Sequence, residues 1–200
     1  PVGSPAANSG RSRLRQRAAD DSDFKRISVL GIGRFGRVVL TKHRNTGKLY
    51  ALKLIGCSKL TVRKHLERTQ TERDVLCRVE HRHIVKLYFA YRTETQFALV
   101  FEYCPGGELF YHLCKRRSLP SESVAFYVAE LALALDCAHS HSVVYRDVKP
   151  ENCLLDARGH LKLVDFGLSK AGISERYQGA HSICGTLEYM APDVIAKKPY

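Results

Sequence analysis

The chain of 200 residues is 44% hydrophobic, contains Tyr and Phe but no Trp, and carries 32 Lys and Arg against 20 Asp and Glu. That length and apolar content predict a globular protein with a substantial core and exclude the fibrous and low-complexity classes. The net charge of +12 suits an anionic partner, such as a nucleotide, a nucleic acid, a membrane surface or an acidic protein, without choosing among them.

No run approaches the ~18 consecutive apolar residues of a membrane span, and the first residues lack an apolar signal core. These features predict an intracellular, cytoplasmic protein without a transmembrane segment. The seven cysteines are odd in number and never spaced as C-x-x-C, which favours reduced thiols that mostly fill the core.

Residues 1–22 are small, polar and rich in arginine, with arginines at alternate positions from Arg11 to Arg17. A segment without an apolar face cannot pack on a core, so this basic tail is expected to be disordered. The alternating arginines could bind acidic lipid or nucleic acid or serve as a nuclear address, which leaves a nuclear location open beside the cytoplasmic one. A solvated tail is the favoured interpretation.

A strand-like alternating pattern begins at Phe24 and leads into three glycines spaced as G-x-G-x-x-G, at Gly31, Gly33 and Gly36. Glycines let backbone amides approach phosphate groups with no side chain in the way. The same spacing marks dinucleotide-binding folds, in which a helix opens directly after the glycines. Here a strand-like run, a turn and a second strand over residues 49–53 follow instead. The glycines therefore lie at a hairpin tip, which favours a phosphate cover of the kinase type.

Lys53 ends the second strand of that hairpin and could point into a cleft beneath the glycines. The ordinary interpretation is a solvated strand lysine. A predicted helix over residues 61–79 carries Glu72, and a strand lysine that clamps phosphates while a helix glutamate holds it is an expected pair in phosphoryl transfer. Glu67 is a rival partner that chemistry alone does not exclude.

Two further strands, over residues 84–90 and 96–104, should complete a small sheet before a Pro-Gly-Gly break that indicates a linker. A helix is expected from Glu108 and a longer one over residues 120–139. The longer helix is supported by apolar residues at positions 124, 125, 128, 131, 132, 135 and 138.

The order of these elements predicts an α+β, bilobal fold, and the motifs described next give it a resemblance to the protein-kinase-like class. The β-rich lobe would span residues 23–103 and an incomplete, mainly helical lobe residues 104–200. Residues 1–22 would form the tail.

After the long helix comes the run YRDVKPEN, which begins at Tyr145, and then the run DFG. Metal-assisted phosphoryl transfer needs one acid to accept or orient a hydroxyl proton, a second acid and an amide oxygen to hold Mg²⁺, and a cation to balance the phosphoryl charge. These roles suit, in that order, Asp147, Asp165, Asn152 and Lys149. A surface turn is the ordinary alternative, and the presence of both motifs at this separation disfavours it.

Taken together, the motifs resemble a eukaryotic protein kinase of the AGC group of Ser/Thr kinases, and are most similar to the ribosomal-protein kinase branch, over residues 24–200. The group favours Tyr145 in place of the His of H-R-D, and residues 183–192 are similar to its activation-segment signature. Lys149, two residues after Asp147, is typical of Ser/Thr rather than Tyr specificity. The resemblance implies protein substrates and the cofactors ATP and Mg²⁺.

The resemblance also implies a nucleotide site between the lobes. Its implied contacts are Gly31, Ile32, Gly33, Arg34, Phe35, Gly36, Val38, Ala51, Lys53, Glu102, Cys104, Glu108, Glu151, Asn152, Leu154 and Asp165. Val38, Ala51 and Leu154 would sandwich the adenine, while Glu102 and Cys104 would meet its edge through backbone groups.

For the chemical step, the implied catalytic residues are Asp147, Lys149, Lys53, Glu72 and Thr186, and the implied metal ligands are Asn152 and Asp165. By the resemblance, Asp147 would be the base, with Lys149 on the γ-phosphate and Thr186 bridging the two. Lys53, paired with Glu72, would hold the α and β phosphates.

Substrate selection and regulation follow from the same resemblance. Glu108 and Glu151 would receive a basic residue upstream of the substrate hydroxyl. Arg146 would grip a phosphate placed on Ser182 by an upstream phosphoinositide-dependent kinase. Such a phosphate brings about −1.5 to −2 charges, so its pairing with Arg146 would tie the activation segment to the catalytic loop.

Two departures from the family pattern stand out. The motif Ala-Pro-Glu ends here in Asp193, one methylene shorter, which leaves its usual ion pair with a later arginine unassigned. The chain also stops at Tyr200, before the tryptophan-containing segment and the buried helix that anchor the catalytic loop in the family. A full kinase domain is expected to continue past this point, and residues 1–200 alone are expected to be poorly stable and nearly inactive.

Two other classes of function stay open. A catalytically silent pseudokinase or scaffold is disfavoured because Lys53, Glu72, Asp147, Asn152 and Asp165 are all present, and pseudokinases usually lose one or more such residues. A nucleic-acid-binding module is suggested only by charge, with no base-stacking platform or recognition motif, so nucleic acid is not the expected partner.

Overall fold

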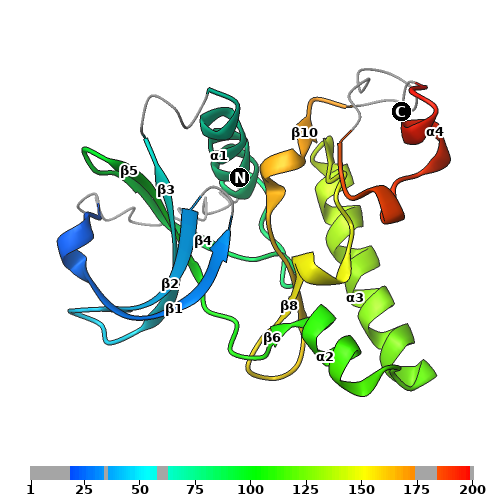
Figure 1. The fold of residues 1–200 in the computed structure, drawn as a ribbon, viewed down its shortest axis with the longest axis horizontal. Helices are drawn as coiled ribbons and strands as arrows, with labels where there is room; N and C mark the ends of the chain where they lie inside the picture. Colours follow the sequence, from blue (N-terminus) through cyan, green and yellow to red (C-terminus); the bar gives the residue numbers. More distant parts are fainter. Residues whose placement is uncertain (1–18, 34–35, 58–62, 174–183, 199–200) are drawn as a thin grey trace, which may run out of the picture.

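The computed structural model describes residues 19–33, 36–57, 63–173 and 184–198. They form an α+β structure in which a β-rich lobe lies beside a mainly helical lobe (Figure 1). This architecture confirms the predicted fold class. Arg34 and Phe35 of the glycine hairpin lie outside the described residues.

A five-stranded antiparallel sheet, in the order β1-β2-β3-β5-β4, forms the first lobe. Its strands are β1 (Phe24–Gly33), β2 (Gly36–His43), β3 (Leu49–Gly56), β4 (Leu87–Arg92) and β5 (Gln96–Glu102). Successive residues of a strand face opposite sides of the sheet. Ala98 and Val100 therefore join Phe24 and Tyr50 in an aromatic-rich cluster on one side. Leu99 joins a different core cluster on the other side.

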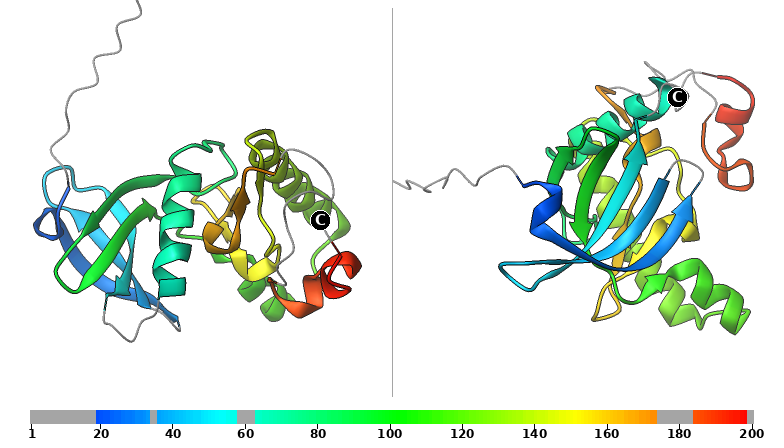
Figure 2. Two further views of the ribbon diagram at one scale, coloured as in Figure 1. Left: turned by 90° about the horizontal axis from the view of Figure 1, so that it is seen from above. Right: turned by 60° about the vertical axis from the view of Figure 1, so that its left-hand side comes forward.

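Helix α1 (Arg63–Leu76) lies between the sheet and the helical lobe (Figure 2). The predicted helix over residues 61–79 extends beyond the observed end at Leu76, and residues 61 and 62 lie outside the described residues. Val75 is buried in the core cluster, and Glu72, one turn earlier, is buried as well. The helix thereby brings a carboxylate to the inner face of the sheet.

The predicted strand over residues 84–90 is two segments in the structure, so that prediction was wrong at its beginning. Ile84 forms a parallel bridge with Leu163 of the helical lobe. The amide of Val85 donates to the carbonyl of Leu163 at 2.9 Å. Only from Leu87 onward does the chain join the sheet as β4. The apolar run predicts extended backbone, but the partner of an extended segment depends on tertiary packing.

The second lobe begins with α2 (Leu109–Arg116) and α3 (Ser121–Ser140), close to the two helices predicted from the sequence. Its strands are β6 (Gly107–Glu108), β7 (Val143–Val144), β8 (Cys153–Leu155), β9 (Leu161–Leu163) and β10 (Lys170–Ala171). Strands β6, β8 and β9 form one sheet, and β7 and β10 form another. Short helical turns are η2 (Pro150–Asn152), η3 (Phe166–Leu168), η4 (Leu187–Tyr189) and α4 (Pro192–Ile195).

The buried face of α3 includes a carboxylate as well as apolar residues. Glu130, Ala134 and Ala138 are buried, four residues apart, as the helical period requires. Val124 and Val128 are 44% and 58% exposed. Of the apolar positions that supported this helix, 131, 135 and 138 are buried or half-buried, whereas 124, 125, 128 and 132 are exposed. Because a carboxylate lies within the packed face, hydrophobicity alone does not define that face.

Asp21 and Ser22, which the sequence assigns to the tail over residues 1–22, are part of a helical turn in the structure. A 3₁₀ turn, η1 (Asp21–Asp23), precedes the first strand. Asp21 accepts hydrogen bonds from Arg26 and from the hydroxyl of Tyr91, which fix the turn against the sheet. Among the described residues, no helix combines the length and apolar character needed to cross a bilayer.

One hydrophobic core cluster runs through both lobes. It includes Val75 of α1, Leu99 of β5, Ala134 of α3 and Leu163 of β9. Phe166, at the start of η3, is fully buried in the same cluster. Because the core is continuous, the motifs that follow β7 and β9 are held in position by both lobes.

Candidate active site

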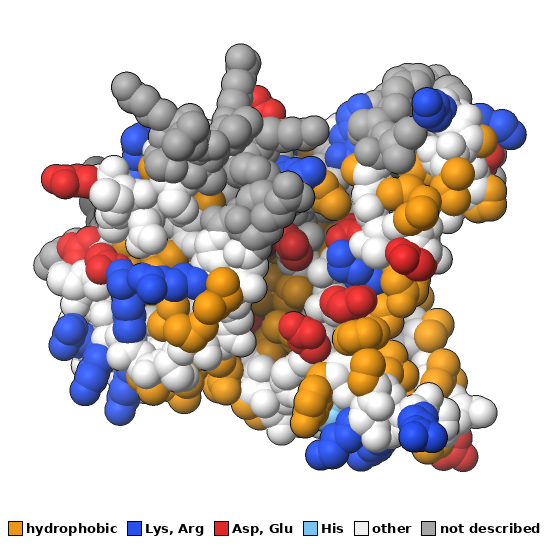
Figure 3. Space-filling view, viewed as in Figure 1, with side chains coloured by type: hydrophobic (Ala, Val, Ile, Leu, Met, Phe, Trp, Pro, Cys, Tyr) orange, Lys and Arg blue, Asp and Glu red, His pale blue; other side chains and the backbone are white. Residues whose placement is uncertain are grey.

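A cavity of about 380 Å³ lies between the lobes, beside the glycine hairpin. It is lined by Gly33, Gly36, Arg37, Val38, Lys53, Ile55, Arg68, Thr69, Glu72, Asp147, Asp165, Gly167 and Leu168. Figure 3 shows acidic side chains along the groove between the lobes, whereas many basic side chains lie at the periphery. The fold thus gathers residues as far apart in sequence as Lys53 and Asp165 around one space.

The glycines of the hairpin serve two different purposes. A Cβ on Gly36 would lie 1.9 Å from the carbonyl oxygen of Leu54, so the packing of β2 on β3 excludes any side chain there. A Cβ on Gly31 would meet nothing within 4 Å, and one on Gly33 would meet only the carbonyl oxygen of Gly36 at 3.9 Å. The fold does not require glycine at these two positions, which leaves open backbone for a ligand to approach.

Lys53 forms ion pairs with two carboxylates. Its Nζ lies 2.7 Å from Oε2 of Glu72 and 3.3 Å from Oδ1 of Asp165. Burial acts to lower the pKa of Lys53, but the two carboxylates outweigh it and raise that pKa, so the ammonium stays charged. For Glu72, burial raises the pKa of the carboxyl, and this effect outweighs the opposing effect of the Lys53 ammonium. The rival residue Glu67 is exposed on α1, and Glu72 is the one that contacts the lysine.

Asp147 is 7% exposed and is held by three side chains. Thr186 Oγ1 donates to its Oδ1 at 2.9 Å, Asn152 Nδ2 donates to its Oδ2 at 2.9 Å, and Lys149 Nζ lies 2.9 Å from Oδ2. Burial alone would raise the pKa of Asp147, but the hydrogen bonds from these three groups outweigh it and lower the pKa below its ordinary value. Lys149 Nζ also donates to Thr186 Oγ1 at 2.8 Å, which closes a ring.

Asn152 and Asp165 fit the role of magnesium ligands. The Nδ2 of Asn152 donates to both the carbonyl and the carboxylate of Asp147, at 2.9 Å each, which leaves the amide oxygen as an acceptor. Asp165 has a left-handed backbone with φ of 59°, and its side chain is 54% exposed at the cavity. Two hard oxygen donors from the protein, completed by phosphate oxygens and water, suit Mg²⁺.

Tyr145 and Phe166 join the two motifs beneath the cavity. Their rings pack edge to face with centroids 4.9 Å apart, and both are almost fully buried. The hydroxyl of Tyr145 donates to the carbonyl of Val164, one residue before Asp165. Burial raises the pKa of Tyr145 well above its ordinary value, so the phenol remains a donor. The tyrosine thus ties the catalytic loop to the segment between β9 and Asp165.

Arg146 binds the beginning of the activation segment. Its guanidinium donates to the carbonyl of Leu168 at 2.7 Å and to that of Ser169 at 3.4 Å. The residue predicted as its phosphorylated partner, Ser182, lies outside the described residues.

Gly185 brings the far end of the activation segment onto the catalytic loop. Its φ is +115°, and a Cβ there would lie 2.6 Å from the carbonyl oxygen of Arg146. Both the backbone conformation and the close approach therefore require glycine. The contact places the next residue, Thr186, within hydrogen-bonding distance of Asp147.

The predicted adenine end of the site is the hinge between β5 and β6. The amide of Gly106 donates to the carbonyl of Leu155 at 3.0 Å, and a Cβ on Gly106 would lie 2.6 Å from Leu155 Cβ. Leu154, on the same strand, is the cross-strand partner of Glu108. Cys104 is buried, which raises the pKa of its thiol to about 12 and keeps it neutral. The hinge thus packs directly on the strand of Leu154.

The other predicted contacts fall into different places. Val38 lines the cavity, and Ala51 packs beside the shared core. Glu108 is exposed at the start of α2. Glu151 is half-buried in η2, and its Oε2 has no hydrogen-bond partner among the residues that the structure describes.

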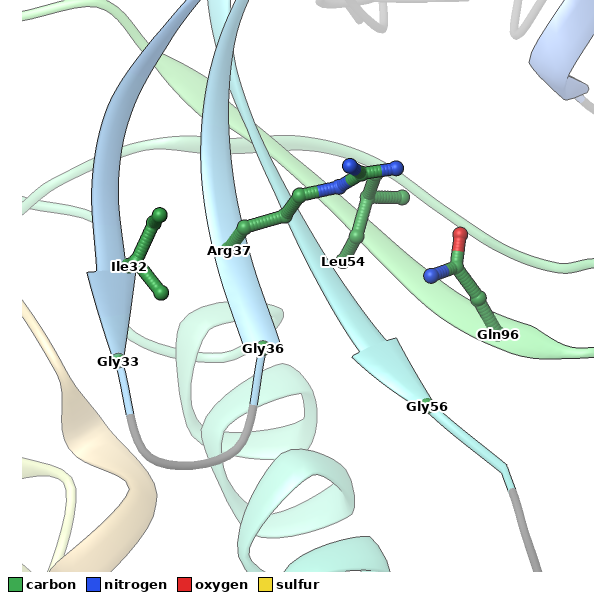
Figure 4. Close-up of a pocket in the computed structure, with 7 residues that line it drawn as sticks. All are labelled: Ile32, Gly33, Gly36, Arg37, Leu54, Gly56 and Gln96. Carbon is green, nitrogen blue, oxygen red and sulfur yellow. The ribbon is translucent and has the colours of Figure 1, made fainter.

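Ile32 does not line this cavity. It is 85% exposed and borders a second hollow of about 340 Å³ with Arg37, Leu54 and Gln96 (Figure 4). Gly33 and Gly36 border both spaces, but none of the candidate catalytic or metal-binding residues lines the second one. The glycine hairpin is therefore the wall between the two hollows.

Sequence reasoning missed two groups that fix β9. Lys162 lies with its Nζ 3.0 Å from Oε1 of Glu102 in the hinge. Glu130 accepts hydrogen bonds from His160 Nδ1 at 2.6 Å and from the amide of Leu161 at 2.7 Å. A lysine between two apolar residues indicates only an exposed strand position, so the pattern carried no signal for this contact.

Comparison with known proteins agrees with this geometry. The family described as "Protein kinase domain" matches residues 24–200. Ribosomal protein S6 kinase alpha-3 of Homo sapiens is 48% identical over 183 residues, which cover 90% of this chain and 24% of that protein. Ribosomal protein S6 kinase alpha-2 of Homo sapiens is 47% identical over 183 residues, covering 90% of this chain and 25% of that protein. Protein kinase 3 of Dictyostelium discoideum is 44% identical over 181 residues, covering 86% of this chain and 20% of that protein.

The chain belongs to the protein kinase family. Within that family it is similar to the ribosomal protein S6 kinases of the AGC group, which confirms the resemblance drawn from its motifs. It spans about a quarter or less of the length of these relatives.

Proposed function

We propose that this protein is an ATP-dependent Ser/Thr kinase that transfers the γ-phosphoryl group of ATP to a hydroxyl of a protein substrate. One observation carries the proposal. The ring of Asp147, Lys149 and Thr186 lies at the same cavity as the ion pair between Lys53 and Glu72. A fixed carboxylate beside two separate cations is the arrangement that phosphoryl transfer needs.

Asp147 is the proton acceptor in this proposal. The substrate hydroxyl oxygen bonds to the γ-phosphorus, its proton passes to the Asp147 carboxylate, and the bond from phosphorus to the bridging oxygen breaks, so that ADP leaves with that electron pair. The lowered pKa makes Asp147 a weak base, which suits a reaction in which the hydroxyl is oriented first and deprotonated late. The Lys149 ammonium balances charge that develops on the transferred group.

The remaining residues would bind and orient the nucleotide. Lys53, charged and braced by Glu72, would hold phosphate oxygens. The open backbone at Gly31 and Gly33 would let amides approach the phosphates. Bound Mg²⁺ would neutralise and orient the phosphates, and the oxygens of Asn152 and Asp165 would hold it.

A basic residue upstream of the substrate hydroxyl is the proposed preference. The chain carries a net charge of +12, yet acidic side chains gather along the groove (Figure 3). Glu108 is exposed at the edge of α2, and Glu151 is half-buried in η2, which contacts α2. An arginine of the substrate would pair with such carboxylates bidentately.

Phosphorylation of Ser182 by an upstream phosphoinositide-dependent kinase is the proposed activating switch. Two contacts support it. Arg146 binds the carbonyls at the beginning of the activation segment, and Gly185, three residues after Ser182, rests on the backbone of Arg146. A phosphate on Ser182 would lie close in sequence to a segment that already contacts the arginine, and pairing would add charge-assisted hydrogen bonds.

Transfer of labelled phosphate from ATP to a serine peptide tests the proposed function. The protein, with any sequence that naturally flanks residues 1–200, should label a peptide with arginine before the serine. A matched peptide with alanine for arginine should be labelled at least several-fold more slowly, and Glu108→Gln with Glu151→Gln should reduce that difference. Binding of ATP without any label in peptide or protein would instead identify a pseudokinase and overturn the proposal.

A further inference from the structure

We propose that Lys162 is a positioning residue for the adenine end of the nucleotide site, acting through the side chain of Glu102. The inference rests on the proposed function, because it assigns the hinge to adenine. It concerns a lysine on β9, in the helical lobe, which reaches across to the last residue of β5, in the sheet lobe.

The carboxylate of Glu102 joins three segments at a single oxygen. Its Oε1 accepts from the Nζ of Lys162 at 3.0 Å and from the amide of Lys86 at 2.8 Å. The amide of Glu102 in turn donates to the carbonyl of Lys86 at 2.9 Å. The hinge strand, the segment before β4 and strand β9 are thereby locked together at the point where β5 ends.

The ion pair between Lys162 and Glu102 is largely shielded from solvent. The side chains of Lys162 and Glu102 are 13% and 22% exposed. By contrast, the exposed pair between Lys86 Nζ and Glu80 involves side chains that are 48% and 79% exposed. Shielded pairs lose less to solvent screening than exposed pairs do, so the Lys162 contact can hold the hinge in place.

The strand register places Lys162 beside Leu154, which is a proposed contact of the adenine ring. Lys162 is the cross-strand partner of Leu154 in the antiparallel pair of β8 and β9. Directly opposed residues project from the same face of such a pair, so the two side chains are neighbours on one face. The lysine therefore links Leu154, the proposed floor of the adenine site, to Glu102, whose backbone is the proposed edge contact. Removing the ammonium should change the spacing between floor and edge.

Among the described residues, Lys162 is the cation whose ammonium donates to Glu102. The Lys86 ammonium pairs with Glu80 and acts on Glu102 only as a more distant charge, while its backbone amide donates to Glu102. Lys86→Met is therefore a matched control, because it removes a neighbouring positive charge and leaves the hydrogen bonds of Glu102 in place. Lys162→Arg keeps the charge and should preserve the contact.

Nucleotide titrations with adenosine and with ATP plus Mg²⁺ test the proposal. Lys162→Met should weaken both ligands by the same factor, roughly 5-fold or more for a coupling of this kind, and should raise the KM for ATP with little change in kcat. Lys162→Arg and Lys86→Met should bind both ligands like the parent. Lys53→Met should behave differently, since it should weaken ATP and leave adenosine binding unchanged.

The outcomes separate this inference from the proposed function. If the parent binds both ligands and Lys162→Met binds adenosine equally well, the positioning role is wrong and the kinase proposal stands. If the parent binds neither ligand, the proposed function fails and the positioning role fails with it. If Lys162→Met does not fold, Glu102→Gln serves as the second variant, because it weakens the same contact with Lys162. A well-folded Glu102→Gln protein must then bind adenosine more weakly than the parent.

Discussion

The two candidate catalytic aspartates, Asp147 and Asp165, are held in opposite ways. Asp147 is 7% exposed and receives hydrogen bonds from three side chains, so its position is set by a polar network. The side chain of Asp165 is 54% exposed, and its Oδ1 lies 3.3 Å from Nζ of Lys53. Its place is set instead by a left-handed backbone and by the buried Phe166 that follows it.

This difference matches the work that each carboxylate is proposed to do. A group that orients and deprotonates one hydroxyl has to be fixed in advance, because misplacement costs rate directly. A group that binds a metal arriving with the nucleotide needs open oxygen atoms and only a fixed backbone. The comparison therefore predicts different failures when either aspartate, or its supports, is altered.

The largest effect is expected from the two aspartates themselves. Asp147→Asn and Asp165→Asn should each lower turnover by at least ~10²-fold. Asp147→Asn should bind ATP with Mg²⁺ like the parent, because it removes the base and keeps the size of the side chain. Asp165→Asn should lose the Mg²⁺-dependent part of ATP binding. Calorimetric titration of each variant with and without Mg²⁺ checks this, and equal nucleotide affinities for both would contradict the division of roles.

Replacement of Lys53 should lower activity by a similar factor, because the ammonium that is proposed to hold the ATP phosphates is lost. Lys53→Met should lower kcat/KM by about 10²-fold, because the cation that pairs with Glu72 and Asp165 is removed. Glu72→Gln should be harmful as well, whereas Glu67→Gln is the control and should be mild. Steady-state kinetics on the three variants measures this. Equal losses from Glu67→Gln and Glu72→Gln would show that the contact on α1 has been misassigned.

The proposed switch at Ser182 should have an intermediate effect. Ser182→Ala should leave only basal activity, roughly 10-fold or more below the phosphorylated parent. Arg146→Ala should abolish the gain from phosphorylation while Asp147 remains in place. Activity before and after treatment with an activating kinase measures both. If the Ser182→Ala enzyme is as active as the phosphorylated parent, phosphorylation of Ser182 is not the activating switch.

Smaller changes should separate the two kinds of glycine. Gly36→Ala should destabilise the fold by about 1–3 kcal/mol, because its Cβ would meet the carbonyl of Leu54 at 1.9 Å. Gly31→Ala should leave the free energy of unfolding nearly unchanged, since its Cβ has open space. Denaturant unfolding of both variants provides the measurement. A Gly31→Ala protein as destabilised as Gly36→Ala would mean that the fold, rather than the ligand, requires that glycine.

The smallest effect concerns pH and the Asp147 network. A carboxylate whose pKa is lowered in the folded state contributes stability above its unfolded pKa of about 3.9 and loses that contribution as the pH falls through the folded pKa. The difference in unfolding free energy between the parent and Asp147→Asn should therefore shrink as the pH is lowered below about 4. A difference that stays constant over this range would show that the network does not favour the ionised form.

Much of this arrangement could be predicted from local sequence. The glycine hairpin, the strand ending in Lys53, the helix bearing Glu72 and the two catalytic runs each carry their own spacing signal. The structure adds which of these groups meet. Lys53 contacts Glu72 rather than Glu67 because of the way α1 is rotated against the sheet. The amphipathic pattern of the helix leaves this rotation ambiguous by about one turn.

The errors arise where tertiary packing, rather than the local pattern, decides the partner of a residue. The packed face of α3 includes Glu130, whose carboxylate binds His160 and the amide of Leu161, so the apolar pattern alone does not define that face. The segment at Ile84 was assigned to the sheet of the first lobe, whereas its partner strand lies in the other lobe. Lys162 was overlooked for the same reason, since its acceptor is a residue of the hinge.

The most direct test of the account is single-turnover transfer of labelled γ-phosphate to an arginine-containing serine peptide, compared between the parent protein and Asp147→Asn at saturating ATP and Mg²⁺. Both proteins would be tested with any sequence that naturally flanks residues 1–200, and ATP binding would be measured in parallel. We predict that the parent transfers phosphate and that Asp147→Asn binds ATP equally well but transfers it at least ~10²-fold more slowly. Transfer at the same rate by both proteins would contradict the assignment of Asp147 as the proton acceptor.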